Sequence, residues 1–384
     1  MLTRGFVLLA AADLAYFTGI GVSVLLLPQW ATGPVGAGEA GAGVAFGAFA
    51  ITALVCRPFA GRLADRHGRR WLLVGVAALC ATGMALLPFV TSLSAVVAVR
   101  LAQGVAEAAF FVAGFALLVD LAPAERLGEA ISYNSLGLYL GLALGPPLGA
   151  WVLDTTGFLV AWQVAAALMV LATALALLLD EPEREHAGQG HGSLLHRPSV
   201  PVAVAFLASL AGVSGFLAFG ALHADRIGFD NAGLPMLAYG LVVVGCRLAF
   251  ARVPDRLPPL RLAATALAGM TVGLVMMAAL DSPAGFLGGV VVMSVGVAFA
   301  TPALFTAVFA TAAPSERGAA SGTASAAIDL GLGLGPVLAG VLAAASGIPA
   351  AFAAGAAVAL AGAAWSLLLA GRQSPSGTSA HRAM

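Results

Sequence analysis

Polar and charged side chains inside apolar stretches are the residues of this sequence that could carry out chemistry. Arg100, Gln103 and Glu107 lie in the apolar segment 94–119 at intervals of three and four residues, so they share one face of a helix with Gly104. Arg100 and Glu107 are about 10 Å apart by helical rise, which is too far for an ideal direct ion pair. We interpret this face either as a site that carries a proton or as a charge network that fixes the helix against a neighbour.

Three carboxylates lie within apolar segments: Asp13, Glu107 and Asp329. A carboxyl group in such surroundings can take up and release a proton, which is general acid–base chemistry. A charge at membrane depth costs roughly 2.5–3.5 kcal/mol on insertion scales, so its presence indicates a function by default. We rank Glu107 first for its depth and its shared face with Arg100. Each carboxylate has the alternative role of packing or capping a helix. Two further polar residues lie in the segment 127–153: Tyr133 and Asn134.

The elements that must position these residues are apolar helices. Of the 384 residues, 60% are hydrophobic and 9% are charged, whereas soluble domains carry about 25% charged residues. Such an excess cannot be hidden in soluble domains, because a soluble surface needs polar cover. The composition excludes a soluble enzyme, a disordered chain and a nucleic-acid-binding protein.

The sequence predicts twelve membrane-spanning helices, since each needs roughly 20 mostly apolar residues. The uncharged stretch 330–371 is too long for one span, so Gly347-Ile348-Pro349 is predicted to form a turn within it. The predicted spans are 6–29, 41–60, 71–90, 94–119, 127–153, 158–180, 198–222, 232–251, 260–280, 284–309, 318–345 and 348–370.

The distribution of arginine predicts the orientation. The chain has 18 basic residues, all arginine. If both termini lie in the cytoplasm, Arg226 is the only arginine outside and Arg100 lies within a helix, while Arg57 and all the others fall in cytoplasmic segments. This pattern satisfies the positive-inside rule. We therefore expect a multi-pass protein of the cell (inner) membrane with both termini in the cytoplasm.

One polar linker divides the spans into six and six. The predicted organisation is an N-terminal half (1–180), a cytoplasmic linker (181–197), a C-terminal half (198–372) and a cytoplasmic tail (373–384). His186, His191 and His196 of the linker are spaced by five, which does not place them on one helix face, and we interpret them as part of a solvated, flexible loop. We expect no metal site.

The two halves resemble each other at a shift of 190 residues. Cys56-Arg57 and Asp65-Arg66 correspond to Cys246-Arg247 and Asp255-Arg256, and Gly145-Pro146 corresponds to Gly335-Pro336. Arginine and aspartate are rare in this chain, so their agreement carries weight. Two six-helix repeats in parallel relation are a plan of secondary transporters, which bind substrate between the halves.

Residues 61–70 read Gly-Arg-Leu-Ala-Asp-Arg-His-Gly-Arg-Arg and are predicted to form a short cytoplasmic loop between spans 2 and 3. This segment resembles the signature G-x-x-x-D-R-x-G-R-R/K of the major facilitator superfamily, and the likeness extends over nearly the whole chain. The resemblance implies that the matching residues gate the movement of the two halves; the alternative is a positively charged anchor without a gating role. The matching residues are Gly61, Asp65, Arg66, Gly68, Arg69 and Arg70.

Two further segments resemble motifs of this superfamily. Arg100 to Gly104 is similar to its R-x-x-Q-G pattern, in which the arginine is implicated in proton coupling. The segment 141–150 is similar to the G-x-x-x-G-P-x-x-G-G pattern of the antiporter branch, with Ala150 in place of the last glycine. The alternative interpretation is generic packing of small residues. The matching residues of this second motif are Gly141, Gly145, Pro146 and Gly149. Residues Asp120, Glu125 and Arg126 resemble a charged stretch that follows span 4 in the family.

The resemblance implies an all-α membrane protein with twelve helices in two six-helix repeats. It also implies a secondary active transporter of the drug:proton antiporter-like branch, which exports a small amphipathic molecule by alternating access. Aromatic residues are the candidates to line the central cavity, unless they face lipid: Tyr16, Phe17, Phe110, Phe111, Phe216 and Phe219. The alternatives are a sugar or metabolite transporter that imports its substrate and a non-transporting membrane sensor.

No catalytic residue set is found, and the chain lacks a Walker-type phosphate-binding loop, so we expect neither an enzyme nor ATP-driven transport. No cofactor is expected, because a proton gradient would supply the energy. The expected partners are a small-molecule substrate, protons and the lipid bilayer, with no nucleic acid. We expect a monomer.

Overall fold

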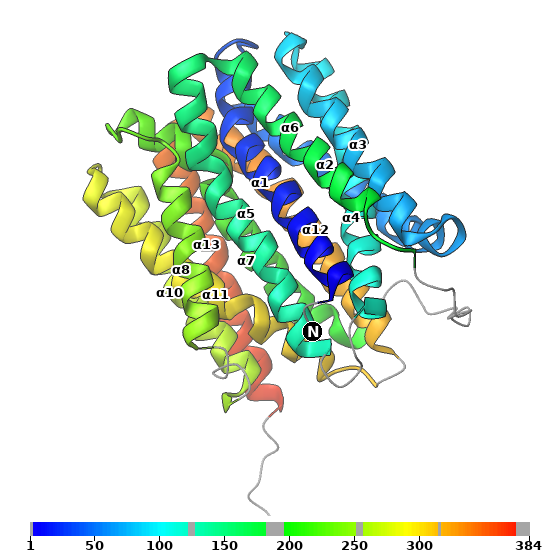
Figure 1. The fold of residues 1–384 in the computed structure, drawn as a ribbon. Coiled ribbons are helices and arrows are strands. Elements are labelled where there is room, and N and C mark those ends of the chain that lie inside the picture. The colour runs from blue at the N-terminus through cyan, green and yellow to red at the C-terminus, as the bar shows by residue number, and fades with distance from the viewer. Residues whose placement is uncertain (1–2, 122–126, 182–195, 251–255, 314–315, 374–384) are drawn as a thin grey trace, which may run out of the picture.

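A computed structural model describes residues 3–121, 127–181, 196–250, 256–313 and 316–373 of the protein. The side chains at 58, 61–62, 65–66, 119–120, 127–133, 135, 317–318 and 373 fall outside the described part, although their backbone is helical. Within the described residues the fold is entirely helical and contains twelve long α-helices (Figure 1).

The order of the helices follows the predicted spans, and their ends differ from the prediction by a few residues. In the N-terminal half they are α1 (Arg4–Thr32), α2 (Gly38–His67), α3 (Arg69–Leu86), α4 (Leu93–Leu121), α5 (Leu127–Thr156) and α6 (Phe158–Leu177). In the C-terminal half they are α7 (Val200–Arg226), α8 (Leu234–Ala249), α10 (Pro259–Ala279), α11 (Pro283–Phe309), α12 (Arg317–Ser346) and α13 (Ile348–Gln373). Two short 3₁₀ turns, η1 (Leu87–Phe89) and η3 (Arg197–Ser199), precede α4 and α7.

Eleven of these helices are long and apolar enough to cross a membrane, and α8 is a shorter apolar helix. A helix satisfies all its backbone hydrogen bonds internally, which is required in lipid. Large apolar side chains also lie on the outer surface: Trp151, Leu248 and Leu338 are each more than 60% exposed. In water such a surface would be unfavourable, so the bundle is built for lipid on its outside.

Local signals in the sequence set several helix ends. Proline stands in the first turn of α7, α8, α10 and α11, where its missing N–H leaves no bond unmade. The side chains of Thr3 and Ser282 accept hydrogen bonds from backbone N–H groups at the starts of α1 and α11. The predicted turn at Gly347 is confirmed: α12 ends at Ser346, Gly347 has φ +85°, and α13 begins at Ile348.

The prediction of a loop at 61–70 is wrong. Helix α2 continues through 61–67, and the connection to α3 is reduced to Gly68, whose φ is +95°. Only Gly61 in this stretch disfavours a helix, and the residues that follow it are compatible with one. The family-like segment is therefore the end of a long helix, followed by a one-residue turn that requires glycine.

Within each half, the helices pack as a bundle. Helix α1 packs against α5 and α6, α2 packs against α4, and α3 packs against α6; in the other half α10 packs against α11 and α13, and α7 against α12 and α13. Helices α1 and α13 have their chain ends at the same end of the bundle, at the lower edge of Figure 1. We call this the termini end.

Two helix pairs join the halves: α2 with α12, and α5 with α8. Small residues allow close contact in both pairs, in the part of each interface away from the termini end. A Cβ atom on Gly43 would collide with the Pro336 carbonyl oxygen, and one on Gly240 would collide with Ala143. Such interfaces bring helix backbones together as in other membrane helix pairs.

Candidate functional site

The guanidinium group of Arg100, on α4, is buried and held by neutral groups. Its Nη1 donates to Oε1 of Gln103 at 2.8 Å, as expected for residues three apart on one helix face. Nε and Nη2 donate to the carbonyl oxygens of Ala45 and Phe46 on α2, at 3.3 and 3.4 Å. The group also lies 4.8 Å from the ring centre of Phe49. Arg100 therefore fixes α4 to α2, and among the described residues no carboxylate directly neutralises its charge.

Glu107 lies four residues after Gln103, on the same face of α4, and is partly buried. In the described part of the chain it makes no hydrogen bond, and three charged residues act on it electrostatically: Arg100, Arg57 and Asp329. The first of these belongs to its own helix, whereas the other two lie on α2 and α12. Glu107 thus stands between the Arg100 cluster and a charged contact that joins the two halves.

That contact is an ion pair between Arg57 of α2 and Asp329 of α12. Nη2 of Arg57 donates to Oδ1 of Asp329 at 2.8 Å, and Nε lies 2.5 Å from Oδ2. The Asp329 side chain is 4% exposed and that of Arg57 is 21% exposed. The guanidinium group also lies 5.3 Å from the ring centre of Phe111. The pair links the halves in the part of the α2–α12 interface nearer the termini end.

Asp329 is one of the candidates that the sequence indicates, whereas its partner Arg57 is not. The sequence groups Arg57 with the cytoplasmic charges, whereas the structure places it at the end of the apolar span of α2, paired with Asp329 of α12. The two residues are 272 positions apart, so local spacing could not reveal the pair. The available signal was that Asp329 is the last charge before a 42-residue uncharged stretch, 330–371, and therefore needed a cationic partner.

Asp13 belongs to a different place in the protein. Its Oδ2 accepts a hydrogen bond from Nδ2 of Asn134 at 2.6 Å, which joins α1 to α5 within the N-terminal half. Its other oxygen, Oδ1, is buried and has no hydrogen-bond partner among the described side chains. The structure therefore brings Glu107 and Asp329 together electrostatically and leaves Asp13 apart. The side chain of Tyr133 lies outside the described residues.

The candidate aromatic residues are mostly packed inside the halves. Tyr16 stacks on Phe110 with ring centres 3.7 Å apart, and Phe17 meets both rings edge-on. The Tyr16 hydroxyl contacts the Cys80 sulfur at 3.2 Å. Phe216 and Phe219 are fully buried in the C-terminal half. These five side chains do not face lipid. Among the six candidates only Phe111 is largely exposed, at 45%.

The described part of the family-like segment 61–70 is tied to other helices. The carboxylate of Glu181 accepts hydrogen bonds from the backbone N–H groups of Arg69 and Arg70, at 2.8 and 3.0 Å, and so caps the start of α3. The Arg69 side chain donates to the carbonyl oxygen of Ala116 on α4 at 3.0 Å. The Arg70 side chain donates to that of Leu177 on α6 at 2.5 Å. The side chains of Asp65 and Arg66, and the space around Gly61, lie outside the described residues.

The glycines of the α5 motif pack α5 against α1. A Cβ atom on Gly141 would lie 2.7 Å from Phe17, and one on Gly145 would collide with the Thr18 carbonyl oxygen. Gly149 has more room, with its nearest neighbour, Val22, at 3.3 Å. Between Gly145 and Gly149, the Pro146-Pro147 backbone contacts Gly233 just before α8. The motif therefore bears both on packing within the N-terminal half and on the contact between the halves.

A second ion pair links the halves at the end of the bundle opposite the termini. Nη2 of Arg226, at the end of α7, lies 2.7 Å from Oε1 of Glu39, at the start of α2. Nearby, the Asn231 side chain donates to the Pro147 carbonyl oxygen at 3.4 Å. From the sequence, Arg226 is predicted only as the one external arginine, and its partner Glu39 is not predicted.

The linker histidines differ from the prediction where they are described. His196 is 7% exposed, its backbone N–H donates to the Thr323 hydroxyl at 2.8 Å, and its Nδ1 lies 3.1 Å from Oγ of Ser199. The interpretation of a solvated loop is therefore wrong for His196, because this residue anchors the end of the linker to α12. His186 and His191 lie outside the described residues, and no metal-binding group occurs in the part of the chain that the structure describes.

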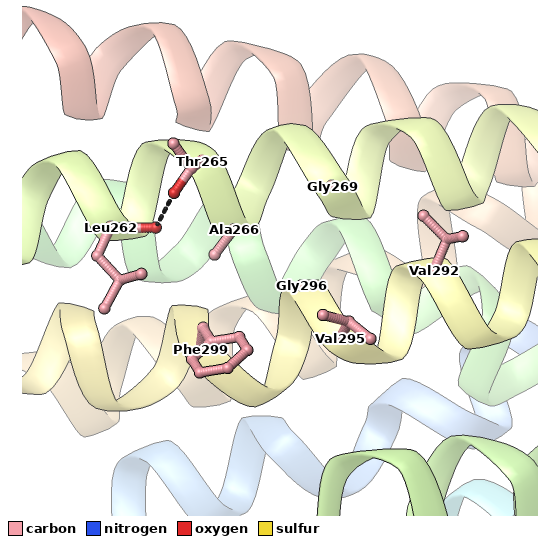
Figure 2. Close-up of a pocket in the computed structure, with 8 residues that line it drawn as sticks. All are labelled: Leu262, Thr265, Ala266, Gly269, Val292, Val295, Gly296 and Phe299. Atoms are coloured by element: carbon pink, nitrogen blue, oxygen red, sulfur yellow. Dashed lines mark hydrogen bonds between the residues drawn. The ribbon is translucent and has the colours of Figure 1, made fainter. Parts of the chain in front are cut away.

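A pocket of about 330 Å³ lies between α10 and α11, away from the charged residues. Figure 2 shows its apolar lining, with gaps at Gly269 and Gly296 where side chains are absent. Its one polar side chain, Thr265, donates to the Leu262 carbonyl oxygen of its own helix at 2.9 Å. The rim residues Thr265 and Val295 are exposed. This pocket is a groove on the outer, apolar face of the bundle and offers no charged group to a ligand.

The arrangement of two helical bundles joined at α2–α12 and α5–α8 agrees with a known family. The family model of the Major Facilitator Superfamily matches residues 9–313 and 232–383. The chain belongs to the major facilitator superfamily. It is accordingly a multi-pass membrane protein and a secondary transporter, and this family is not one of enzymes.

Sequence relatives share the length of this transporter. An uncharacterized MFS-type transporter of Burkholderia mallei (strain SAVP1) is 30% identical over 369 residues, which cover 94% of this chain and 90% of that protein. One of Salmonella typhimurium (strain LT2) is 28% identical over 374 residues, which cover 92% and 93%.

Solved structures share its fold. The nucleoside transporter NupG has a TM-score of 0.78 at 16% identity and covers 96% of this chain and 98% of its own. A bacterial homolog of the human lysosomal transporter Spinster, inward-facing and occupied, has a TM-score of 0.74 at 16% identity, with coverage of 97% and 96%. The human organic anion transporter MFSD10 has a TM-score of 0.67 at 19% identity, with coverage of 94% and 99%. At these identities the likeness concerns the fold alone.

Proposed function

We propose that this transporter exports a small amphipathic molecule in exchange for protons, and that Glu107 carries the proton. The observation that carries the proposal is the position of Glu107 beside both Arg100 and the Arg57–Asp329 pair. Because that pair joins the halves, a charge change at Glu107 alters the energy of the contact that holds them together.

The sign of the coupling follows from the charges. Ionised Glu107 and Asp329 both attract Arg57, so an ionised Glu107 competes with the pair between the halves. A proton on Glu107 removes that competition and leaves Arg57 to Asp329 alone. Protonation therefore favours the arrangement described here, and release of the proton favours its opening. At an effective dielectric constant near 20, two unit charges interact by about 4 kcal/mol when they are about 4 Å apart and by about 2 kcal/mol when they are about 8 Å apart. Either energy is enough to shift such an equilibrium.

Export and an amphipathic cargo have weaker support. The resemblance of the α5 motif to the antiporter pattern supports export, and its Pro146-Pro147 backbone contacts the C-terminal half, so the motif lies where the halves meet. The exposed ring of Phe111 beside Arg57 offers an apolar face next to a charge, which suits an amphipathic molecule. We further propose that the protein acts as a monomer in the cytoplasmic membrane, with the termini end in the cytoplasm and no cofactor.

A metabolite importer is the second candidate, because one solved neighbour in fold is a nucleoside transporter. The two candidates differ in the direction of flux. Inverted vesicles would accumulate an exported compound, whereas right-side-out vesicles would accumulate an imported one.

The test is substrate-dependent proton leak in inverted vesicles that hold an imposed proton gradient, with fluorescent amphiphiles and radiolabelled nucleosides as compounds. Glu107→Gln should abolish the leak, because the neutral amide cannot carry a proton. Asp154→Asn is the matched control: Asp154 is an exposed carboxylate near the end of α5, and its loss should leave the leak unchanged. A leak that survives Glu107→Gln would contradict the assignment of the proton to Glu107.

A further inference from the structure

The internal repeat brings a second arginine to the position that Arg57 occupies. Positions 57 and 247 are 190 apart, and so are positions 139 and 329. Arg247 of α8 therefore corresponds to Arg57 of α2, and Tyr139 of α5 corresponds to Asp329 of α12. The structure brings the second pair together as it does the first, since the guanidinium carbon of Arg247 lies 4.1 Å from the ring centre of Tyr139. Both contacts join the two halves.

The two contacts differ in one group, the carboxylate. Arg57 holds both oxygens of Asp329 with the edge of its guanidinium group that carries Nε and Nη2. On Arg247 the same two nitrogens are shielded from solvent and have no hydrogen-bond partner in the part of the chain that the structure describes. Tyr139 presents the face of its ring to the guanidinium group of Arg247. It does not accept a hydrogen bond from Nε or Nη2 of that group. The Arg247–Tyr139 contact thus repeats the Arg57–Asp329 contact but lacks the anionic group that binds Nε and Nη2 of the arginine.

We propose that this edge of Arg247 binds the anionic group of the transported molecule, a carboxylate or a sulfonate. The planar fork of arginine matches two oxygens of such a group, which would take the place that Asp329 takes against Arg57. The proposal rests on the proposed transport function and specifies the charge of the cargo. The anion reaches the fork as α5 and α8 part.

Aromatic groups extend from this fork into the C-terminal half. Tyr239 of α8 lies within electrostatic reach of both Tyr139 and Arg247. Its ring centre is 5.7 Å from that of Phe216 on α7. Phe216 is fully buried, so an anion at Arg247 would have the partly exposed rings of Tyr139 and Tyr239 beside it for its apolar part. These rings favour an amphipathic anion over a small inorganic one.

A purely topological role does not account for this arrangement. An arginine that serves only to orient a helix extends its charged end to water. Arg247 as a whole is partly buried, and two of its nitrogens, Nε and Nη2, lie out of contact with solvent and without an acceptor among the described residues. Buried, unpaired donors are unfavourable, and a ligand that satisfies them is bound correspondingly well.

The test measures binding to the full-length protein purified in detergent. Two probe pairs share a scaffold and differ in charge: fluorescein with rhodamine 6G, and 2-naphthoate with 2-naphthylmethylammonium. The wild type should bind the anion of each pair more tightly. Arg247→Gln should weaken anion binding at least tenfold, equivalent to about 1.4 kcal/mol, and leave binding of the cations unchanged. Arg247→Lys should retain part of the affinity, because a point charge remains.

Substitution of Tyr139 provides the sharper comparison. Tyr139→Asp supplies the carboxylate that Asp329 supplies in the first copy, so it should occupy Arg247 and abolish anion binding in a folded protein. Tyr139→Asn introduces a side chain of the same shape as aspartate but without its charge. This variant should therefore bind the anions more tightly than Tyr139→Asp. Gel filtration and a thermal unfolding curve show that each variant is folded.

Three outcomes would overturn the proposal: equal binding of anions by the wild type and Arg247→Gln, a preference for the cations, or no binding of either probe of a pair. The proposed function fails differently, because it depends on proton leak in vesicles. Arg247-dependent anion binding without any proton-coupled flux would overturn the export function and leave the anion site standing.

Discussion

Loss of the Asp329 carboxylate should shift the balance between the arrangements of the two halves. In Asp329→Asn, Arg57 keeps its charge and loses its counter-ion. Removal of one partner of a buried ion pair costs about 3–5 kcal/mol. The Arg57 side chain is 21% exposed, so water compensates part of the loss and we take about 2 kcal/mol. This changes the equilibrium about thirtyfold, so an arrangement favoured by about 20:1 would become a minority state.

Spin labels report this shift directly. Asp154, near the end of α5, and Asp281, between α10 and α11, are both exposed at the end of the bundle opposite the termini, one in each half. Cysteines at these positions, in a background without the three native cysteines, allow the distance distribution to be measured by pulsed electron paramagnetic resonance. Asp329→Asn should add a second population of distances.

The double variant Arg57→Gln/Asp329→Asn is the control that isolates the charge. It leaves no unpaired ion, so its distance distribution should return toward that of the wild type. An unchanged distribution in folded Asp329→Asn would refute the reasoning, and so would a double variant that departs from the wild type by the sum of the single effects.

Two further predictions concern packing and helix capping. Gly145→Val should lower the yield and thermal stability of the purified protein, because its side chain collides with the α1 backbone. Gly149→Ala should be tolerated, since the nearest atom belongs to the Val22 side chain; equal stability of these two variants would contradict the packing account. Glu181→Gln should destabilise the start of α3 by about 1 kcal/mol, seen as a lower thermal midpoint, because its carboxylate caps two N–H groups there. An unchanged midpoint in Glu181→Gln would show that the cap adds nothing to stability.

The helices could be predicted from the sequence because lipid leaves the backbone few choices. Apolar length gives the spans, and Gly347 divides the uncharged stretch 330–371 where the structure divides it. The pairing of Arg100 with Gln103 also follows from local helical spacing. These predictions depend on residues that are close in the sequence.

The contacts between distant helices could not be obtained in this way. Arg57 and Asp329 are 272 residues apart, and Asp13 and Asn134 are 121 apart, so their distances depend on how whole helices pack. The role of Glu181 was missed for a related reason, because the residue that it caps belongs to α3 and not to its own segment. The segment 61–67 is predicted as part of a loop because it lies between two apolar spans and begins with a glycine, although the residues after Gly61 are compatible with a helix.

Helix α2 is long enough for a small tilt to move its end by a large distance. Its 30 residues span about 45 Å, whereas the hydrocarbon core of a bilayer is about 30 Å thick. At Gly43, α2 lies against the α12 backbone, so we expect α2 to tilt about this point. His67 lies 24 residues beyond it, or about 36 Å along the axis, so a tilt of about 10° would move the tip by about 6 Å. A small rotation at the contact between the halves is thus amplified into a large displacement of the turn at Gly68.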